Sequence, residues 1–137
     1  MICVTGDLET CLALRRQVFI EEQGVSLEED VDGLDPSATH LLAMVDGRPV
    51  GTARLLELGD TGKIGRVCVL PEARGAGLGA ALIRAAVEEF RHRPGIARVK
   101  LGAQVHALEF YEKLGFRAFG PEYMDAGIAH RDMALAL

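Results

Sequence analysis

A glycine-rich stretch is the densest chemical signal in this chain. It begins at Arg74, reads Arg-Gly-Ala-Gly-Leu-Gly-Ala to Ala80, and follows an apolar run that ends at Pro71. Glycines let a backbone approach a ligand closely, and the first turn of a following helix presents free N–H groups and the positive end of the helix dipole. The stretch can therefore bind a phosphate or another anion, and the Arg74 guanidinium could add a positive charge.

Three kinds of phosphate-binding turn compete for this stretch. A nucleotide P-loop needs Gly-Lys followed by Ser or Thr, whereas two alanines follow the last glycine here. A dinucleotide site matches the spacing of Gly75, Gly77 and Ala80, but the next expected strand, 98–103, contains no acidic residue for the ribose hydroxyls. The third kind is the pattern Arg-x-x-Gly-x-Gly, and a turn that merely joins a strand to a helix would also fit it.

A second motif lies at 107–116 and reads Ala-Leu-Glu-Phe-Tyr-Glu-Lys-Leu-Gly-Phe. With Val67-Cys68-Val69 and the glycine-rich stretch, it makes the chain similar to the GNAT superfamily of N-acetyltransferases, whose pyrophosphate loop is written Q/R-x-x-G-x-G/A and whose later helix contains A-x-x-F-Y-x-x-x-G-F. Further segments resemble the ElaA/YjcF-like branch of that superfamily, so that the resemblance covers nearly the whole chain: 14–23, 39–43, 65–67, 103–104 and 127–130.

The resemblance implies an α+β fold in α/β/α layers. Its central sheet would be mixed, mostly antiparallel and of six to seven strands, with helices on both faces, in one GNAT domain over residues 1–137. The implied enzyme uses acetyl-CoA, needs no metal, and transfers the acetyl group directly to a primary amine of an unidentified small-molecule or peptide acceptor. The alternative on the same fold is a non-catalytic acyl-CoA sensor or regulatory module.

The resemblance also implies which residues contact the cofactor. The strand before the loop would run beside pantetheine, the loop would hold the pyrophosphate, and Gln104 stands where many members have Asn, which changes that contact. The cofactor-binding residues are Val67, Cys68, Val69, Arg74, Gly75, Ala76, Gly77, Leu78, Gly79, Ala80 and Gln104.

One residue is the candidate for protonating the leaving group, whereas four residues compete for the role of general base. Tyr111 matches the family tyrosine that stabilises or protonates the departing CoA thiolate, and its alternative role is core packing. Glu22 and His40 rank first as the general base, ahead of His106 and His130, and each also has an ordinary structural interpretation. Cys68 has no base beside it in the sequence, so packing is favoured over a nucleophilic role.

Composition narrows the classes of partner. Among 137 residues, 49% are hydrophobic, and 15 basic against 20 acidic side chains give a net charge of -5, which disfavours nucleic acid. No apolar run of membrane-spanning length or secretory signal occurs, so we expect a cytoplasmic protein that binds no membrane. The three cysteines suggest buried packing rather than disulfides or zinc, and both a monomer and a homodimer fit the sequence.

The acidic segment 28–35 has two interpretations. It could attract a cationic amine towards the site, or it could be a solvated loop. Its spacing does not fit an EF-hand, and we assign no metal.

Hydrophobic periodicity and turn residues predict the elements that position these groups. Asp7 is expected to cap a first helix that Gly24 ends, and a loop with at most one helical turn follows it at 26–36. The later helices are expected at 77–90 and 107–114. The expected strands are 2–5, 41–45, 50–58, 64–70, 98–103, 116–119 and 130–137.

Overall fold

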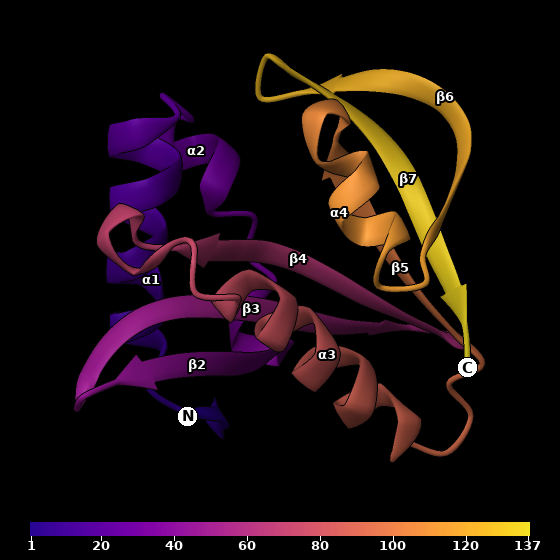
Figure 1. The fold of residues 1–137 in the computed structure, drawn as a ribbon, viewed down its shortest axis with the longest axis horizontal. Helices are drawn as coiled ribbons and strands as arrows, with labels where there is room; N and C mark the ends of the chain where they lie inside the picture. Colours follow the sequence, from indigo (N-terminus) through magenta and orange to yellow (C-terminus); the bar gives the residue numbers. More distant parts are fainter.

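A computed structural model describes residues 1–137 as one seven-stranded sheet with helices on both faces (Figure 1). The strand order is β1-β2-β3-β4-β5-β7-β6, and every neighbouring pair is antiparallel except β4 and β5. The predicted fold class is confirmed. The strands are β1 (Ile2–Thr5), β2 (Thr39–Val45), β3 (Arg48–Leu58), β4 (Thr61–Val69), β5 (Arg98–Gln104), β6 (Arg117–Asp125) and β7 (Ile128–Ala136). The helices are α1 (Leu8–Arg15), α2 (Leu27–Asp30), α3 (Leu78–Arg91) and α4 (Leu108–Glu112).

The first helix begins and ends as its capping residues predict. The Asp7 carboxylate accepts a hydrogen bond from the Thr10 N–H, and α1 then continues as a π-helical segment, Arg16–Glu22. Gly24 follows with φ of +74°, a conformation that glycine adopts without strain. The helix therefore delivers Glu22 and Gln23 to one end of the sheet.

Two apolar cores lie on opposite faces of the sheet. The larger one contains the predicted stripe of α3, where Leu82, Ile83 and Phe90 are almost completely buried against β3, β4 and β5, and side chains of α4 pack on it. The smaller one joins Cys11 and Leu14 of α1 to strands β2 and β4. The sheet thus has α3 and α4 on one face and α1 on the other.

Strands β4 and β5 pair only over the first half of their length. Their parallel register ends at Ile64 opposite Leu101, and Figure 1 shows β4 continuing towards α1 while β5 runs towards α4. A β-bulge lies just beyond, at Arg66, whose φ is +50°. Consequently Ile64 faces the larger core, whereas Cys68 faces the smaller one.

The C-terminal hairpin corrects one predicted boundary. The strand expected at 116–119 continues to Asp125 because a register shift between Phe119 and Tyr123 absorbs Gly120 and Pro121, which resemble a strand terminator in the sequence. The α-helical part of the element expected at 107–114 is also shorter, at Leu108–Glu112.

None of the helices combines the length and the apolar character needed to cross a bilayer.

Candidate active site

The site is a cavity of about 320 Å³ that opens where β4 and β5 separate. Residues 63–67 of β4 and 100–102 of β5 line it, together with Gln104, and Tyr111 of α4 completes that side. The hairpin β6–β7, the π-helical segment after α1, the helix α2 and the connection between these two helical segments supply the remaining walls. The unpaired edges of both strands leave backbone groups available to a ligand.

The glycine-rich loop joins the end of β4 to α3, as predicted. Gly77 is the N-cap residue with φ of +80°, and the first helical hydrogen bond runs from the Ala81 N–H to the Gly77 carbonyl. The amides of the first turn therefore have no intrahelical acceptor. A Cβ on Gly79 would lie 3.6 Å from the Phe110 ring, so the loop adjoins α4.

Arg74 and Glu22, predicted for different roles, bind each other. The two guanidinium Nη atoms lie 2.7 and 2.6 Å from the Glu22 carboxylate oxygens, and Arg74 Nε donates to the Val69 carbonyl at 2.9 Å. The hydrogen bonds from Arg74 lower the pKa of Glu22. A carboxylate with a lowered pKa is a weaker proton acceptor, and this pairing disfavours Glu22 as the base.

Tyr111 lies in the cavity wall. Its ring makes edge-on contacts with Phe110 and Phe116, at centroid distances of 5.0 and 6.2 Å. Burial raises the pKa of Tyr111, so the phenol is protonated at neutral pH. The side chain can therefore donate a proton or a hydrogen bond into the cavity.

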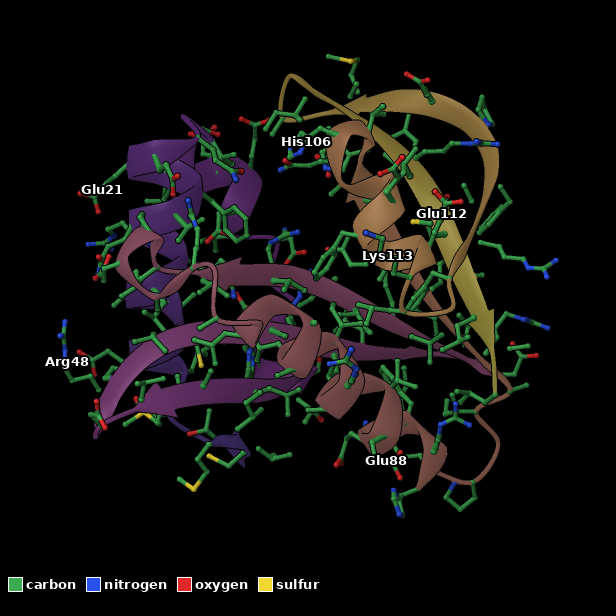
Figure 2. All side chains as sticks on the ribbon, viewed as in Figure 1. Glu21, Arg48, Glu88, His106, Glu112 and Lys113 are labelled. Carbon is green, nitrogen blue, oxygen red and sulfur yellow. The ribbon has the colours of Figure 1, made fainter.

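Gln104 spans the gap between the first helix and β5. Its Nε2 donates to Gln23 Oε1 at 3.3 Å, and its Oε1 accepts from His106 Nε2 at 2.6 Å. Figure 2 shows His106 beside the start of α4. The amide is thus engaged by neighbouring side chains at the cavity rim.

His40 lies outside the cavity wall. It is buried on β2, and its Nε2 donates to the Asp35 carbonyl at 3.0 Å. This hydrogen bond ties the loop after α2 to the sheet. The position favours the structural interpretation of His40 over a catalytic one.

The acidic segment 28–35 contributes to a network of six charged side chains. Arg15 is bound by Asp30 at 3.1 Å and by Asp35 at 2.7 Å. Arg54 and Arg66 bind Asp32 at 2.8 and 3.2 Å. All three aspartates of this segment are therefore bound by arginine, which is neither of the two interpretations made from the sequence.

The cysteines differ in position. Cys68 is buried in the smaller core, and burial raises the pKa of its thiol to about 12. It therefore remains a thiol at neutral pH, which disfavours the nucleophilic role. Cys11 is buried as expected, whereas the prediction for Cys3 was wrong because Cys3 is exposed.

Several cavity residues were not found from the sequence. Lys100, Tyr123 and Asp132 form a chain in which the Tyr123 hydroxyl donates to Asp132 Oδ1 at 2.7 Å and Lys100 Nζ lies 3.5 Å from Asp132 Oδ2. They come from three strands, β5, β6 and β7. Only the hairpin register brings them together, and no local motif marks them.

Comparison with known proteins agrees with this architecture. A family model described as "Acetyltransferase (GNAT) domain" matches residues 9–137. The uncharacterized N-acetyltransferase YjcF of Bacillus subtilis is 35% identical over 128 residues, which cover 93% of this chain and 91% of YjcF.

Solved structures give the same result. The crystal structure of Escherichia coli ElaA superimposes with a TM-score of 0.85 at 31% identity, covering 98% of this chain and 99% of ElaA. An acyl-CoA N-acyltransferase from Pseudomonas aeruginosa superimposes with a TM-score of 0.87 at 32% identity, covering 99% and 98%. The predicted resemblance to the branch that contains ElaA and YjcF is confirmed.

Proposed function

Because the chain belongs to the GNAT acetyltransferase family, we propose that it transfers an acetyl group from acetyl-CoA directly to a primary amine. The observation that supports this most is the cavity between the separating strands β4 and β5, which has Tyr111 in its wall. The glycine-rich loop follows directly at the end of β4. A cosubstrate held by the loop would have its reactive end beside the tyrosine.

The residues present fit acetyl-CoA as the bound cosubstrate. The exposed loop from Gly75 to Gly77 and the free amides of the first turn of α3 suit an anionic pyrophosphate. The edge of β4 beyond Ile64, unpaired on the β5 side, suits the amides of pantetheine, which need hydrogen-bond partners. Arg74 would add a positive charge at the loop.

Tyr111 would act on the leaving group. A protonated phenol in a partly desolvated wall can donate its proton to the departing thiolate of CoA. Nothing in this step requires a protein nucleophile, which agrees with the buried and protonated thiol of Cys68. The acceptor amine would approach from the rest of the cavity.

The proposal is tested with Tyr111→Phe. We expect turnover, measured as free thiol released from acetyl-CoA with a panel of primary amines, to fall by about 10²-fold or more, because the general acid is lost. The heat of acetyl-CoA binding in calorimetry should remain. Unchanged turnover would remove the role of Tyr111.

Two outcomes with the wild-type protein separate the alternatives. Tight binding of acetyl-CoA without transfer to any amine in the panel would support the non-catalytic sensor. If well-folded protein gives no heat with CoA or acetyl-CoA, the proposed function is wrong. Binding of NAD instead would favour the dinucleotide interpretation of the glycine spacing.

A further inference from the structure

The β6–β7 side of the cavity contains a histidine that the proposed mechanism does not use. His130 of β7 lines the cavity, as does Tyr123, its partner across the hairpin. We propose that this side binds the acceptor amine and that His130 Nε2 takes the proton from its nitrogen. The inference rests on the proposed function and names the base that the sequence left open.

The hydrogen bond of the His130 ring fixes its tautomer. Nδ1 lies 2.7 Å from the carbonyl oxygen of Ile128. A carbonyl only accepts hydrogen bonds, so Nδ1 carries the hydrogen. In the neutral imidazole Nε2 is then unprotonated, and its lone pair is available as a base.

The ring is also held in place from the neighbouring strand. It stacks on Tyr123 with a centroid distance of 5.9 Å and an interplanar angle of 23°. Tyr123 is itself fixed by its hydrogen bond to Asp132. Burial and this hydrogen bond raise the pKa of Tyr123, so the phenol remains a donor to Asp132 at neutral pH. A base whose orientation is fixed in this way can receive a proton without first reorganising.

His130 is better placed than the other candidates. Its register partner on β5 is Gln104, at the end of the strand where the gap from β4 has opened. Glu22 is occupied by Arg74, and His40 and His106 are absent from the cavity wall. Tyr111 lines the same cavity, so the side chains of a proton acceptor and a proton donor both border the space where the reacting groups would meet.

The transfer balances with these two side chains. The amine nitrogen forms a bond to the carbonyl carbon of the thioester, and the carbon–sulfur bond breaks. An alkylammonium substrate first loses one proton to His130 Nε2 and so becomes the neutral nucleophile. Its nitrogen loses a second proton to solvent as the amide forms, and the departing thiolate takes a proton from the Tyr111 hydroxyl. Solvent water then returns both side chains to their starting protonation states.

The size of the cavity limits the acceptor. Its volume of about 320 Å³ must hold the reacting end of the cosubstrate as well as the amine. Pockets for drug-sized ligands begin at about 300 Å³. The part of the acceptor that enters the cavity is therefore compact, either a small amine or a single extended side chain.

The charged groups that line the cavity together with His130 come from five elements. Both signs of charge are present among them. They are Asp125 and Asp132 on the hairpin, Lys100 on β5, Lys63 and Arg66 on β4, and Glu29 and Asp30 on α2.

Two nucleophiles of different basicity test the role of His130. An alkylamine is almost fully protonated near neutral pH, since such ammonium groups have pKa values of about 10. Hydroxylamine is largely neutral there and needs much less help from a base. We expect His130→Gln to slow acetylation of the amine that the wild-type protein uses best by about 10²-fold, while hydroxylamine acetylation changes far less.

The matched control is His92→Gln. His92 Nδ1 also donates to a backbone carbonyl, that of Glu88 at 2.8 Å, but the side chain is exposed at the end of α3 and does not line the cavity. This variant should behave like the wild-type protein with both nucleophiles. Calorimetry with acetyl-CoA shows that each variant is folded.

A spectroscopic measurement checks the geometry without turnover. Nitrogen-15 NMR distinguishes the two tautomers of each of the four histidines, and the His130→Gln variant assigns the signal. We expect His130 in the ligand-free protein to have its hydrogen on Nδ1. A hydrogen on Nε2 would overturn the inference.

The kinetic outcomes separate this inference from the proposed function. His130 is not the base if His130→Gln acetylates the alkylamine as fast as the wild-type protein does. The same conclusion follows if the variant binds acetyl-CoA but its acetylation rates with the alkylamine and with hydroxylamine fall equally. In both cases the acetyltransferase function stands. If the wild-type protein binds acetyl-CoA but transfers to no amine and not to hydroxylamine, the proposed function is wrong and the inference is wrong with it.

Discussion

Two arginine–carboxylate groups near the cavity have similar geometry and very different surroundings. Arg15 binds Asp30 through two nitrogens at 3.1 and 3.3 Å, and their side chains are 1% and 4% exposed. Arg74 binds Glu22 through two nitrogens at 2.7 and 2.6 Å, and theirs are 42% and 38% exposed. Geometry alone would make the second pair the stronger one.

Burial reverses that ranking for folding. Removing one member of a buried pair leaves a charge in a medium that solvates it poorly, whereas water replaces the lost partner of an exposed pair. The Arg15 network joins α1, the loop after α2, β3 and β4, and so fixes one wall of the cavity. The Arg74 pair lies at the glycine-rich loop, where a bound anion would compete with Glu22 for Arg74.

The largest effect is expected from Asp35→Asn. Asp35 neutralises both Arg15 and Arg54, at 2.7 and 3.3 Å. We expect the free energy of unfolding, measured by urea denaturation, to fall by about 3 kcal/mol or more, because two buried guanidinium groups lose a shared charge. Asp60→Asn is the control, since the exposed Asp60 carboxylate binds the exposed Arg98 side chain and the Thr61 hydroxyl. This change should alter stability by about 0.5 kcal/mol or less.

The same network predicts the acid sensitivity of the fold. Burial opposes ionisation of Asp35, but hydrogen bonds and charge from Arg15 and Arg54 outweigh it and hold the pKa of Asp35 below its usual value of 3.8. The stabilisation is therefore complete above pH 3.8 and is lost as the pH falls from there towards the folded-state pKa. Urea denaturation at several acidic pH values should show a steeper loss in the wild-type protein than in Asp35→Asn. If the unfolding free energy falls equally steeply with pH in both proteins, the arginine contacts do not lower the pKa of Asp35.

The exposed pair should affect binding more than folding. Arg74→Ala removes a charged donor from the glycine-rich loop that is proposed to hold the pyrophosphate, and charge-assisted hydrogen bonds are worth about 1.5 to 3 kcal/mol. We expect the dissociation constant of CoA in calorimetry to rise by about 10- to 100-fold, with a loss of unfolding free energy of about 1 kcal/mol or less. Arg48→Ala removes the same charge at the start of β3, beside the β2–β3 turn and far from α4 (Figure 2), and should leave CoA binding unchanged. A large loss of stability in Arg74→Ala would instead mean that Arg74 stabilises the fold, as the Arg15 network does.

Local patterns in the sequence predicted the parts of the site that depend on backbone geometry. The α3 stripe follows from helical periodicity, and the loop follows from glycines that adopt positive φ at Gly75 and Gly77. Tyr111 lies in the cavity wall because its helix follows β5 after only a single 3-10 turn. Each of these features is encoded within about a dozen residues.

The base could not be identified in this way because its surroundings are assembled from distant segments. Glu22 and Arg74 are 52 positions apart, so their pairing is invisible in either local motif. His130 meets Tyr123 only through a hairpin whose bulge at Gly120 and Pro121 looks like the end of a strand. The ion-pair partners of the aspartates in 28–35 are likewise distant in sequence, because they are arginines of α1, β3 and β4.

The smallest effect is expected from Glu22→Gln, and it tests whether the exposed pair competes with the ligand. The change frees the Arg74 guanidinium from an exposed carboxylate, and exposed pairs contribute little to folding. CoA should therefore bind up to about fivefold more tightly while stability barely changes. Glu21→Gln is the matched control, because Glu21 is the adjacent exposed acid and makes no ion pair with Arg74 (Figure 2). Turnover with the best alkylamine should be retained, since Glu22 bound to Arg74 is a poor base. Weaker CoA binding would show that Glu22 orients Arg74 towards the phosphate rather than competing with the phosphate for Arg74. A loss of turnover as large as that of His130→Gln would mean that Glu22 is the base after all.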